Sequence, residues 1–419
     1  MVILRNRDML ALWLGQTLSQ GGIRMQQIAL AWWIVTSAGG SGTALGVFMV
    51  AGALPAILLV KAVGRAVDAV PSKRVLVTAD LVSGVLAAAM AAGLHFKVLD
   101  LALACAGGLL LAASQAFFDP ALNKAVAEAV EPGDVEEAVA FQASTQSLAS
   151  FAGAVAGALL IDRLGIDGVV LLNAASFFVS AAINASLRMR HARPPAAPDD
   201  AAALSGWAIL SRMPVIKRVL LGFGCVNFFM TPILLVLPLY VRGVLGGSAS
   251  MLGAIEAGLW MGLVAGTAAS KWPGFSSGAA DGGKAVIGLG AKCMAVIGLA
   301  LLLPGFFPGA WVFAGLLFLA GAALGVNNVK FVALFQETVA QEHKGRFFAL
   351  MAAVVSFSFP AAFFLFGLLT DLLDPRKVCV LQGLGVLALA LYFRRLSTGA
   401  DLLLSPGAGG LSRSPEAQA

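Results

Sequence analysis

Long apolar runs follow one another along the chain, separated by short breaks rich in charge, glycine or proline. A stretch of about 20 apolar residues is what an α-helix needs to cross the hydrocarbon core of a bilayer. The pattern therefore predicts an all-α polytopic membrane protein with twelve transmembrane helices. The predicted spans are residues 10–36, 43–63, 75–95, 99–123, 139–163, 167–187, 215–241, 249–270, 285–304, 309–335, 346–371 and 377–395.

The longest polar break divides these spans six to six. Residues 189–213, rich in Pro, Ala and charge, are predicted to form a linker between an N-terminal half at 1–188 and a C-terminal half at 214–395. Residues 396–419 contain little to pack, so we expect a disordered tail. A shift of 209 residues aligns 159–162 (LLID) with 368–371 (LLTD), and 128–130 with 337–339. Two six-helix, pseudo-symmetric halves, related by an axis along the membrane normal, follow from this repeat.

Composition agrees with a membrane protein and excludes a water-soluble enzyme. The 419 residues are 59 % hydrophobic and 12 % charged, with a mean hydropathy of +0.89, whereas globular domains carry about 25 % charge. With the N-terminus assigned to the cytoplasm, 21 of the 28 Lys and Arg residues lie on that side and five on the other. This bias predicts a multi-pass protein of a bacterial-type cytoplasmic (inner) membrane with both termini in the cytoplasm. The net charge of +6 is explained in this way without nucleic acid as a partner.

Sequence signatures of enzymes are missing. The chain has no GxxxxGK[ST] loop for a nucleotide and no HExxH or GxSxG pattern, and its three histidines lie in predicted loops or at span ends. We therefore expect no enzymatic activity, no cofactor and no metal, and ATP is not expected to drive the protein directly.

Polar residues inside the predicted spans are the strongest functional signal, since each is costly in lipid unless it faces protein or water. In span 1 they recur at steps of three and four, which places them on one helical face, and spans 4, 7 and 10 carry similar sets. Trp260 in span 8 is a candidate for the apolar wall of a cavity. The substrate-binding candidates are Gln16, Gln20, Arg24, Gln27, Gln115, Asp119, Asn123, Asn227, Asn327, Asn328, Lys330 and Trp260.

Four charged residues in these spans allow more than one interpretation. Arg24 is a fixed charge suited to an anionic substrate group or a gate, to an ion pair with Asp119, or to snorkelling. Lys330 lies near enough to the end of span 10 to snorkel instead of binding substrate. Glu256 is a candidate proton carrier, together with Asp119, and its alternative role is to pair with a basic neighbour.

Two further features concern contacts between helices. Asp162 and Asp371 end spans 5 and 11, where we expect them to bind helix termini or nearby basic residues. Gly153 and Gly157 in span 5 form a small-xxx-small pair, interpreted either as ordinary close packing or as a degraded antiporter motif.

Between spans 2 and 3 the chain reads GRAVDAVPSKR, a G-x-x-x-D-x-x-x-x-[KR]-R pattern over residues 64–74. Here the sequence resembles the major facilitator superfamily, whose signature loop has this spacing at this position. Gly64, Asp68, Lys73 and Arg74 are the matching positions and are expected to form a conformational latch. The resemblance also implies that spans 1, 4, 7 and 10 line a central cavity.

Further matches resemble the drug, macrolide and siderophore exporter branch of that superfamily. They include residues 6–8 (NRD), 28–33 (IALAWW), 237–241 (LPLYV) and 336–339 (QETV). In such relatives the first span usually carries Gly-Asp, where this chain has Gly22 and Ile23. The substitution removes one position at which proton coupling would be expected.

Together, these features predict a secondary active transporter that works by alternating access. The resemblance implies an antiporter that exports an amphipathic, drug-like or siderophore-like molecule with coupling to protons or another ion. The two cations Arg24 and Lys330 favour an anionic group on that cargo. An importer of a siderophore or other organic anion, and a lysophospholipid flippase, remain as alternatives. We expect a monomer in the lipid bilayer, with a small-molecule substrate.

Overall fold

The computed structural model describes residues 6–37, 40–130, 134–188, 214–272, 283–339 and 343–398. Their regular structure is helical throughout. The elements are α1 (Arg7–Thr36), α2 (Gly42–Leu58), α3 (Val60–Ala69), α4 (Ser72–His95), α5 (Leu101–Ala129), α6 (Val135–Ala185), α8 (Pro214–Met230), α9 (Ile233–Gly243), α10 (Ala249–Ala269), α11 (Lys284–Leu302), the short 3₁₀ turn η4 (Leu303–Gly305), α12 (Ala310–Thr338), α13 (Lys344–Leu372) and α14 (Pro375–Thr398).

The helices account for the twelve predicted spans. By length and composition, nine helical segments in the described part of the chain could cross a membrane, and the bent pair α2 and α3 makes ten. Helix α1 is long enough at 30 residues, but its face of Gln and Arg lowers its hydropathy. Helix α6 supplies two spans, because its 51 residues would extend about 77 Å and a bilayer core is about 30 Å thick.

Two breaks in the helices have a local cause. Within α6, Gly165 has a φ of 74° and a ψ of 173°, a left-handed conformation that favours glycine and ends the first span of α6. Between α8 and α9, Thr231 and Pro232 interrupt the predicted span 7, since proline cannot donate the next helical hydrogen bond. The expected linker at 189–213 lies outside the described residues, as does the expected tail beyond Thr398.

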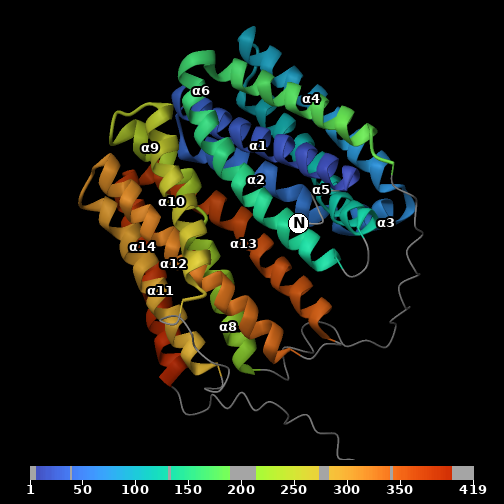
Figure 1. The fold of residues 1–419 in the computed structure, drawn as a ribbon. Helices are drawn as coiled ribbons and strands as arrows, with labels where there is room; N and C mark the ends of the chain where they lie inside the picture. The colour runs from blue at the N-terminus through green and yellow to red at the C-terminus, as the bar shows by residue number, and fades with distance from the viewer. Residues whose placement is uncertain are drawn as a thin grey trace, which may run out of the picture.

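The helices form two bundles, α1 to α6 and α8 to α14 (Figure 1). In the first bundle, α1 packs closely along α6. A Cβ added at Gly157 would lie 2.8 Å from the Cα of Met25, and one at Gly153 would overlap the carbonyl group of Gly21. The small-xxx-small pair therefore does bring two backbones together.

The bundles touch near one end of the molecule. We call the side where α1 begins and α14 ends the terminal face, and the other side the opposite face. At the opposite face the carboxylate of Asp371 on α13 accepts hydrogen bonds from the backbone N–H groups of Gly42 (2.5 Å) and Thr43 (2.9 Å), which begin α2. The expectation that Asp371 binds a helix terminus is confirmed, whereas Asp162 is exposed.

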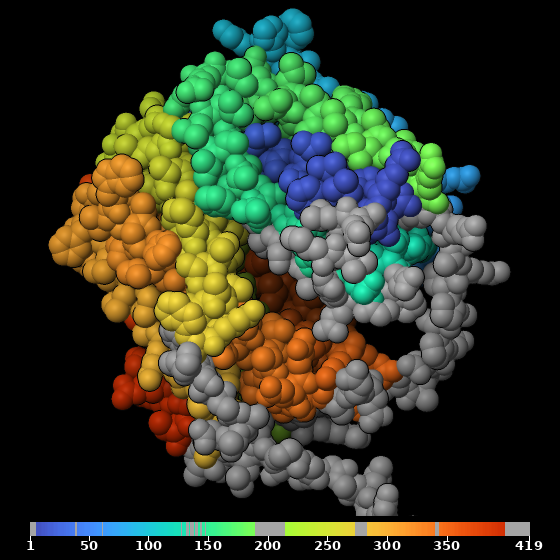
Figure 2. Space-filling view, in the orientation of Figure 1, coloured from blue at the N-terminus to red at the C-terminus, as the bar shows by residue number. Residues whose placement is uncertain are grey.

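Close backbone contact continues along the same two helices. A Cβ at Gly367 would lie 2.8 Å from the carbonyl oxygen of Gly42 and 3.2 Å from the Cα of Gly46. Helices α6 and α10 approach similarly where Gly253 faces Ala158. Away from these contacts, a hollow separates the green atoms of α6 from the orange atoms of α13 (Figure 2). The two halves thus meet at the opposite face and are parted further along.

Candidate substrate site

A cavity of about 490 Å³ lies between the two bundles. Its walls come from α1, α2 and α5 of the first bundle and from α9, α10 and α13 of the second, whereas α12 contributes none of the lining residues. Most of the lining is apolar, with Phe48, Met49 and Phe363 as its larger side chains. The polar lining residues are Gln20, Arg24, Gln26, Gln27, Gln115, Asp119 and Glu256. Such a lining suits an amphipathic molecule of drug-like size.

The only cation in this lining is held by a carboxylate of the other bundle. A guanidinium nitrogen of Arg24 forms a short ion pair with Oε1 of Glu256 on α10. Another donates to Oε1 of Gln27, 2.9 Å away. Trp260 completes the group, because its Nε1 donates to Glu256 at 3.2 Å and its ring centroid lies 5.3 Å from the guanidinium carbon. The side chains of Arg24 and Glu256 are only 15 % and 5 % exposed, so solvent screens the pair little.

Asp119 has a different environment on α5. Its Oδ1 accepts one hydrogen bond, from Nε2 of Gln20 at 3.3 Å, and no described cation bonds to it. The ion pair predicted for Arg24 with Asp119 is therefore absent, and Arg24 pairs with Glu256 instead. Glu256 pairs with a basic neighbour, which was one of its two predicted roles.

Other candidates in the first bundle lie away from the cavity. Gln16 is buried inside the bundle, and its Nε2 has no partner among the described residues. Asn123 accepts from Nε2 of Gln142 at 3.1 Å. The helical face predicted in span 1 therefore divides, since Gln20, Arg24 and Gln27 reach the cavity and Gln16 does not.

In the second bundle, none of the four candidates on spans 7 and 10 lines the cavity. Asn227 donates to the carbonyl oxygen of Phe223 in its own helix, and Asn327 is buried with both side-chain polar atoms unpartnered in the described structure. Asn328 and Lys330 are half-buried elsewhere on α12. The cavity draws on α9, α10 and α13 because these are the helices that meet the first bundle.

The signature loop does not form a closed latch here. Gly64 meets no neighbour that an added Cβ would touch within 4 Å, so no close helix approach depends on it. Asp68 and Arg74 are exposed, and neither side chain bonds to a described residue. Lys73 does make a contact, donating from Nζ to the carbonyl oxygen of Leu187 at the end of α6 (2.8 Å).

A buried carboxylate in α4 was not among the residues predicted from the sequence. Asp80 is fully buried, and its Oδ2 lies 2.7 Å from Oγ of Ser180 and 2.8 Å from Nδ2 of Asn184, both on α6. Oγ of Ser180 is also 3.2 Å from the carbonyl oxygen of Gly15 on α1, so three helices share the cluster. Asp80 lies within the predicted span 75–95, and the criterion that selected Arg24 and Glu256 would have found it.

Two other polar contacts were also missed. Gln26 on α1 accepts a hydrogen bond from Nδ2 of Asn173 at 2.6 Å, inside the first bundle. Lys124 on α5 donates to the carbonyl oxygen of Val67 at 2.7 Å, which satisfies the C-terminal end of α3. Across the described residues, no group of three His, Cys, Asp or Glu side chains could hold a metal ion.

A cavity between two helical bundles that touch at one face is the arrangement of a membrane transporter. The model of the Major Facilitator Superfamily matches residues 12–360. The chain belongs to this superfamily, as the signature loop indicated. It is therefore a transporter and not an enzyme.

Relatives and solved structures agree with this assignment. Macrolide efflux protein A of Streptococcus pyogenes is 22 % identical over 391 residues, which cover 91 % of this chain and 93 % of that protein. A mutant of the nucleoside transporter NupG has a similar structure, with a TM-score of 0.74, 12 % identity, and coverage of 93 % of this chain and 100 % of that one. A bacterial homologue of the iron transporter ferroportin in an inward-facing state gives 0.73 and 13 %, with coverage of 95 % and 100 %.

Proposed function

We propose that this transporter exports cationic, amphipathic small molecules from the cytoplasm by alternating access, in exchange for protons. The observation that carries the proposal is the charge of the cavity. Arg24 is neutralised by Glu256, and the carboxylate of Asp119 is left facing the cavity with Gln20 as its hydrogen-bond partner. The similarity to a macrolide efflux protein supports outward transport.

This charge distribution removes the argument for an anionic cargo. Lys330 does not line the cavity, and the positive charge of Arg24 is already paired. An ionised Asp119 then gives the lining a net negative charge, which attracts a cation. A carboxylate that binds either cargo or a proton exchanges one for the other, which is the requirement for antiport.

The Arg24–Glu256 pair has a separate role in this proposal. It joins α1 of one bundle to α10 of the other, so any motion that parts the bundles at the opposite face must break or stretch it. With the terminal face in the cytoplasm, as the Lys and Arg distribution predicts, the structure corresponds to an inward-open state. The ion pair then acts as a gate that holds the outer side shut, and Asp68 and Arg74 engage only when the cytoplasmic side closes.

Two ions of the same shape and opposite charge test the cargo class. Tetraphenylphosphonium is a lipophilic cation and tetraphenylborate its anionic counterpart, and binding of each to the purified protein is measured by calorimetry. We expect the cation to bind more tightly, and Asp119→Asn to weaken its binding about tenfold, corresponding to about 1.4 kcal/mol. Asp119→Asn should not weaken binding of the anion.

One control variant and one further test variant complete the experiment. Asp162→Asn removes an exposed carboxylate away from the cavity and should leave both affinities unchanged. Arg24→Gln frees Glu256 and should strengthen binding of the cation. Tighter binding of tetraphenylborate, lost in Arg24→Gln, would instead establish the anionic cargo predicted from the sequence and reject our proposal.

Direction and coupling are tested in vesicles. In both kinds of vesicle, the membrane face that is outside in the cell is made acidic. The labelled cation should then accumulate in inside-out vesicles and not in right-side-out vesicles. Accumulation only in right-side-out vesicles would indicate an importer. Movement that is indifferent to the proton gradient would remove the exchange step from the proposal.

A further inference from the structure

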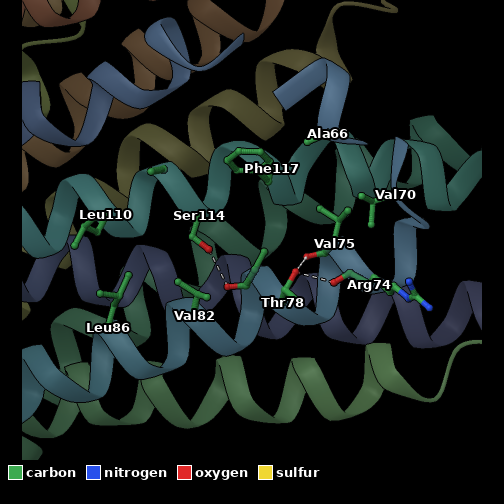
Figure 3. A pocket seen from close by; sticks show the side chains of 12 residues that line it. Ala66, Val70, Arg74, Val75, Thr78, Val82, Leu86, Leu110, Ser114 and Phe117 are labelled. Carbon is green, nitrogen blue, oxygen red and sulfur yellow. Dashed lines mark hydrogen bonds between the residues drawn. The ribbon is translucent and has the colours of Figure 1, made fainter. Parts of the chain in front are cut away.

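A second concave site lies on the outside of the first bundle, away from the substrate cavity. This groove has a volume of about 690 Å³ and is formed by α3, α4 and α5. Figure 3 shows the side chains that line it, from Leu86 and Leu110 at one end to Arg74 at the other. Of its lining residues, the transport mechanism proposed above uses only Arg74, which belongs to the latch.

The groove is apolar along its length. Nine of its twelve lining residues are Ala, Val, Leu or Phe. The hydroxyl of Thr78 donates to the carbonyl oxygens of Arg74 (2.7 Å) and Val75 (3.1 Å), and Ser114 donates to the carbonyl oxygen of Ala79 (2.9 Å). The polar atoms in the wall are thus satisfied by the backbone, and the wall has no need of water or of a polar ligand.

The groove has one charged lining residue, Arg74, at one end. Arg74 is exposed, its guanidinium group makes no hydrogen bond or ion pair within the described residues, and it lies at the start of α4 on the terminal face. In Figure 3 the guanidinium points out of the groove, beyond Val70 and Val75. The groove therefore has a cation at the membrane surface and apolar walls that extend from it into the bilayer.

The dimensions fit one leaflet of a membrane. Arg74 and Leu86 are twelve residues apart on α4, which at 1.5 Å per residue corresponds to about 18 Å. Half of a hydrocarbon core is about 15 Å. A single acyl chain that begins at the headgroup level beside Arg74 would therefore run the length of the groove.

We propose that this groove is a binding site for an anionic phospholipid of the leaflet on the terminal face, with its phosphate at Arg74 and one acyl chain between α4 and α5. Acyl chains gain little from leaving one apolar surface for another. Selection among lipids therefore comes from the charge, and a juxtamembrane Arg or Lys favours an anionic lipid about fivefold.

The location also connects the lipid to the substrate cavity. Helix α5 separates the two sites, because Ser114 and Phe117 face the groove while Gln115 and Asp119 face the cavity. A lipid seated in the groove packs against the outer face of the helix that carries Asp119.

Native mass spectrometry of protein extracted from vesicles tests the proposal. The vesicles contain equal amounts of phosphatidylglycerol and phosphatidylcholine with identical acyl chains, and the readout is the ratio of the two in the first lipid adduct. We expect wild-type protein to favour phosphatidylglycerol, and Arg74→Gln to reduce the ratio about fivefold. Arg218→Gln, which removes an exposed arginine near the start of α8, should leave the ratio unchanged.

A second variant tests the position of the acyl chain. Val82→Trp fills the groove from an exposed position while keeping Arg74, and it should reduce the occupancy of both lipids by a similar factor. The proposal is overturned if Arg74→Gln leaves the ratio unchanged, if Arg218→Gln lowers it equally, or if Val82→Trp leaves occupancy intact. Because Arg74 and Val82 are exposed, each variant is expected to elute as the wild-type species in size-exclusion chromatography.

Discussion

Two helix pairs that occupy related places in the two bundles are held together by different chemistry. The 209-residue shift carries α4 onto α11 and the second span of α6 onto α14, and both pairs pack tightly. Between α4 and α6 lies the hydrogen-bonded cluster of Asp80, Ser180 and Asn184. Between α11 and α14, two glycines bring the backbones together: a Cβ at Gly383 would lie 2.6 Å from the carbonyl oxygen of Gly298.

The contrast is sharpest at one position. The shift places Asn184 over Phe393, and both side chains are buried. Asn184 bonds to Asp80, whereas the Phe393 ring packs edge-on to Phe331 of α12, with centroids 5.9 Å apart. The second span of α6 is thus held by directional hydrogen bonds, and its counterpart α14 by close glycine contacts and aromatic packing. The polar solution places a carboxylate between the two helices, and the apolar one does not.

The largest effect is expected at Phe393. Phe393→Ala should lower the free energy of unfolding by about 3–5 kcal/mol, because it leaves a cavity between α14, α12 and α8. The free energy is measured by titration with sodium dodecyl sulfate in mixed micelles. Phe357→Ala on α13, where the ring is 64 % exposed, should change it by less than about 0.5 kcal/mol. Equal losses in the two variants would show that packing around Phe393 does not hold the C-terminal bundle.

The glycine contact should be the next most sensitive feature. Gly383→Ala places a Cβ against backbone atoms of Gly298 and Leu302, which cannot rotate away, so we expect a loss of about 1–3 kcal/mol. Gly315→Ala on α12 is the matched control, since its Cβ would meet nothing within 4 Å. Alanine favours a helix over glycine, so the control should be neutral or slightly stabilised. Similar stability of both variants would contradict close backbone packing of α11 and α14.

The polar cluster should show coupling that a purely apolar pair lacks. In a double-mutant cycle of Asp80→Ala and Asn184→Ala, we expect a coupling energy of about 1–2 kcal/mol, near the upper end of such values in membrane proteins. A second cycle pairs Asp80→Ala with Asn173→Ala, a buried α6 residue that bonds to Gln26 instead. It should give no coupling beyond about 0.5 kcal/mol. Equal coupling in both cycles would mean that Asp80 acts through general repacking and not through its bond to Asn184.

The sequence was sufficient to predict the helices and their order, for a physical reason. Each span must satisfy its backbone within itself in lipid, so length and hydropathy define it locally. The break at Gly165 falls between two predicted spans, whereas the break at Pro232 lies inside the predicted span 215–241. The pairing of side chains depends on how the helices come together. Arg24 and Glu256 were both recognised as unusual, but 232 positions separate them, and nothing local joins them.

The spacing of polar residues along a helix predicted only some of the residues that line the cavity. Gln20 and Gln16 are one turn apart and equally polar, yet only Gln20 reaches the cavity. Helix α1 packs mainly against α6 of its own bundle and only a little against the second bundle, so part of its polar face is buried and part faces the cavity. Helical periodicity identifies a face without indicating which neighbour covers it.

The smallest effect is expected at a buried polar residue on α14, one of the two helices in the apolar pair. Gln382 on α14 is buried and donates to the carbonyl oxygen of Phe229 at 3.1 Å, while its Oε1 has no partner among the described residues. Gln382→Met loses one hydrogen bond, worth about 1 kcal/mol, but also removes an unsatisfied buried oxygen that costs a similar amount. We expect the free energy of unfolding to change by less than about 0.5 kcal/mol, measured as for Phe393. A loss above about 2 kcal/mol would show that the C-terminal bundle also depends on a polar bond between its helices, and the contrast between the two pairs would then be one of degree.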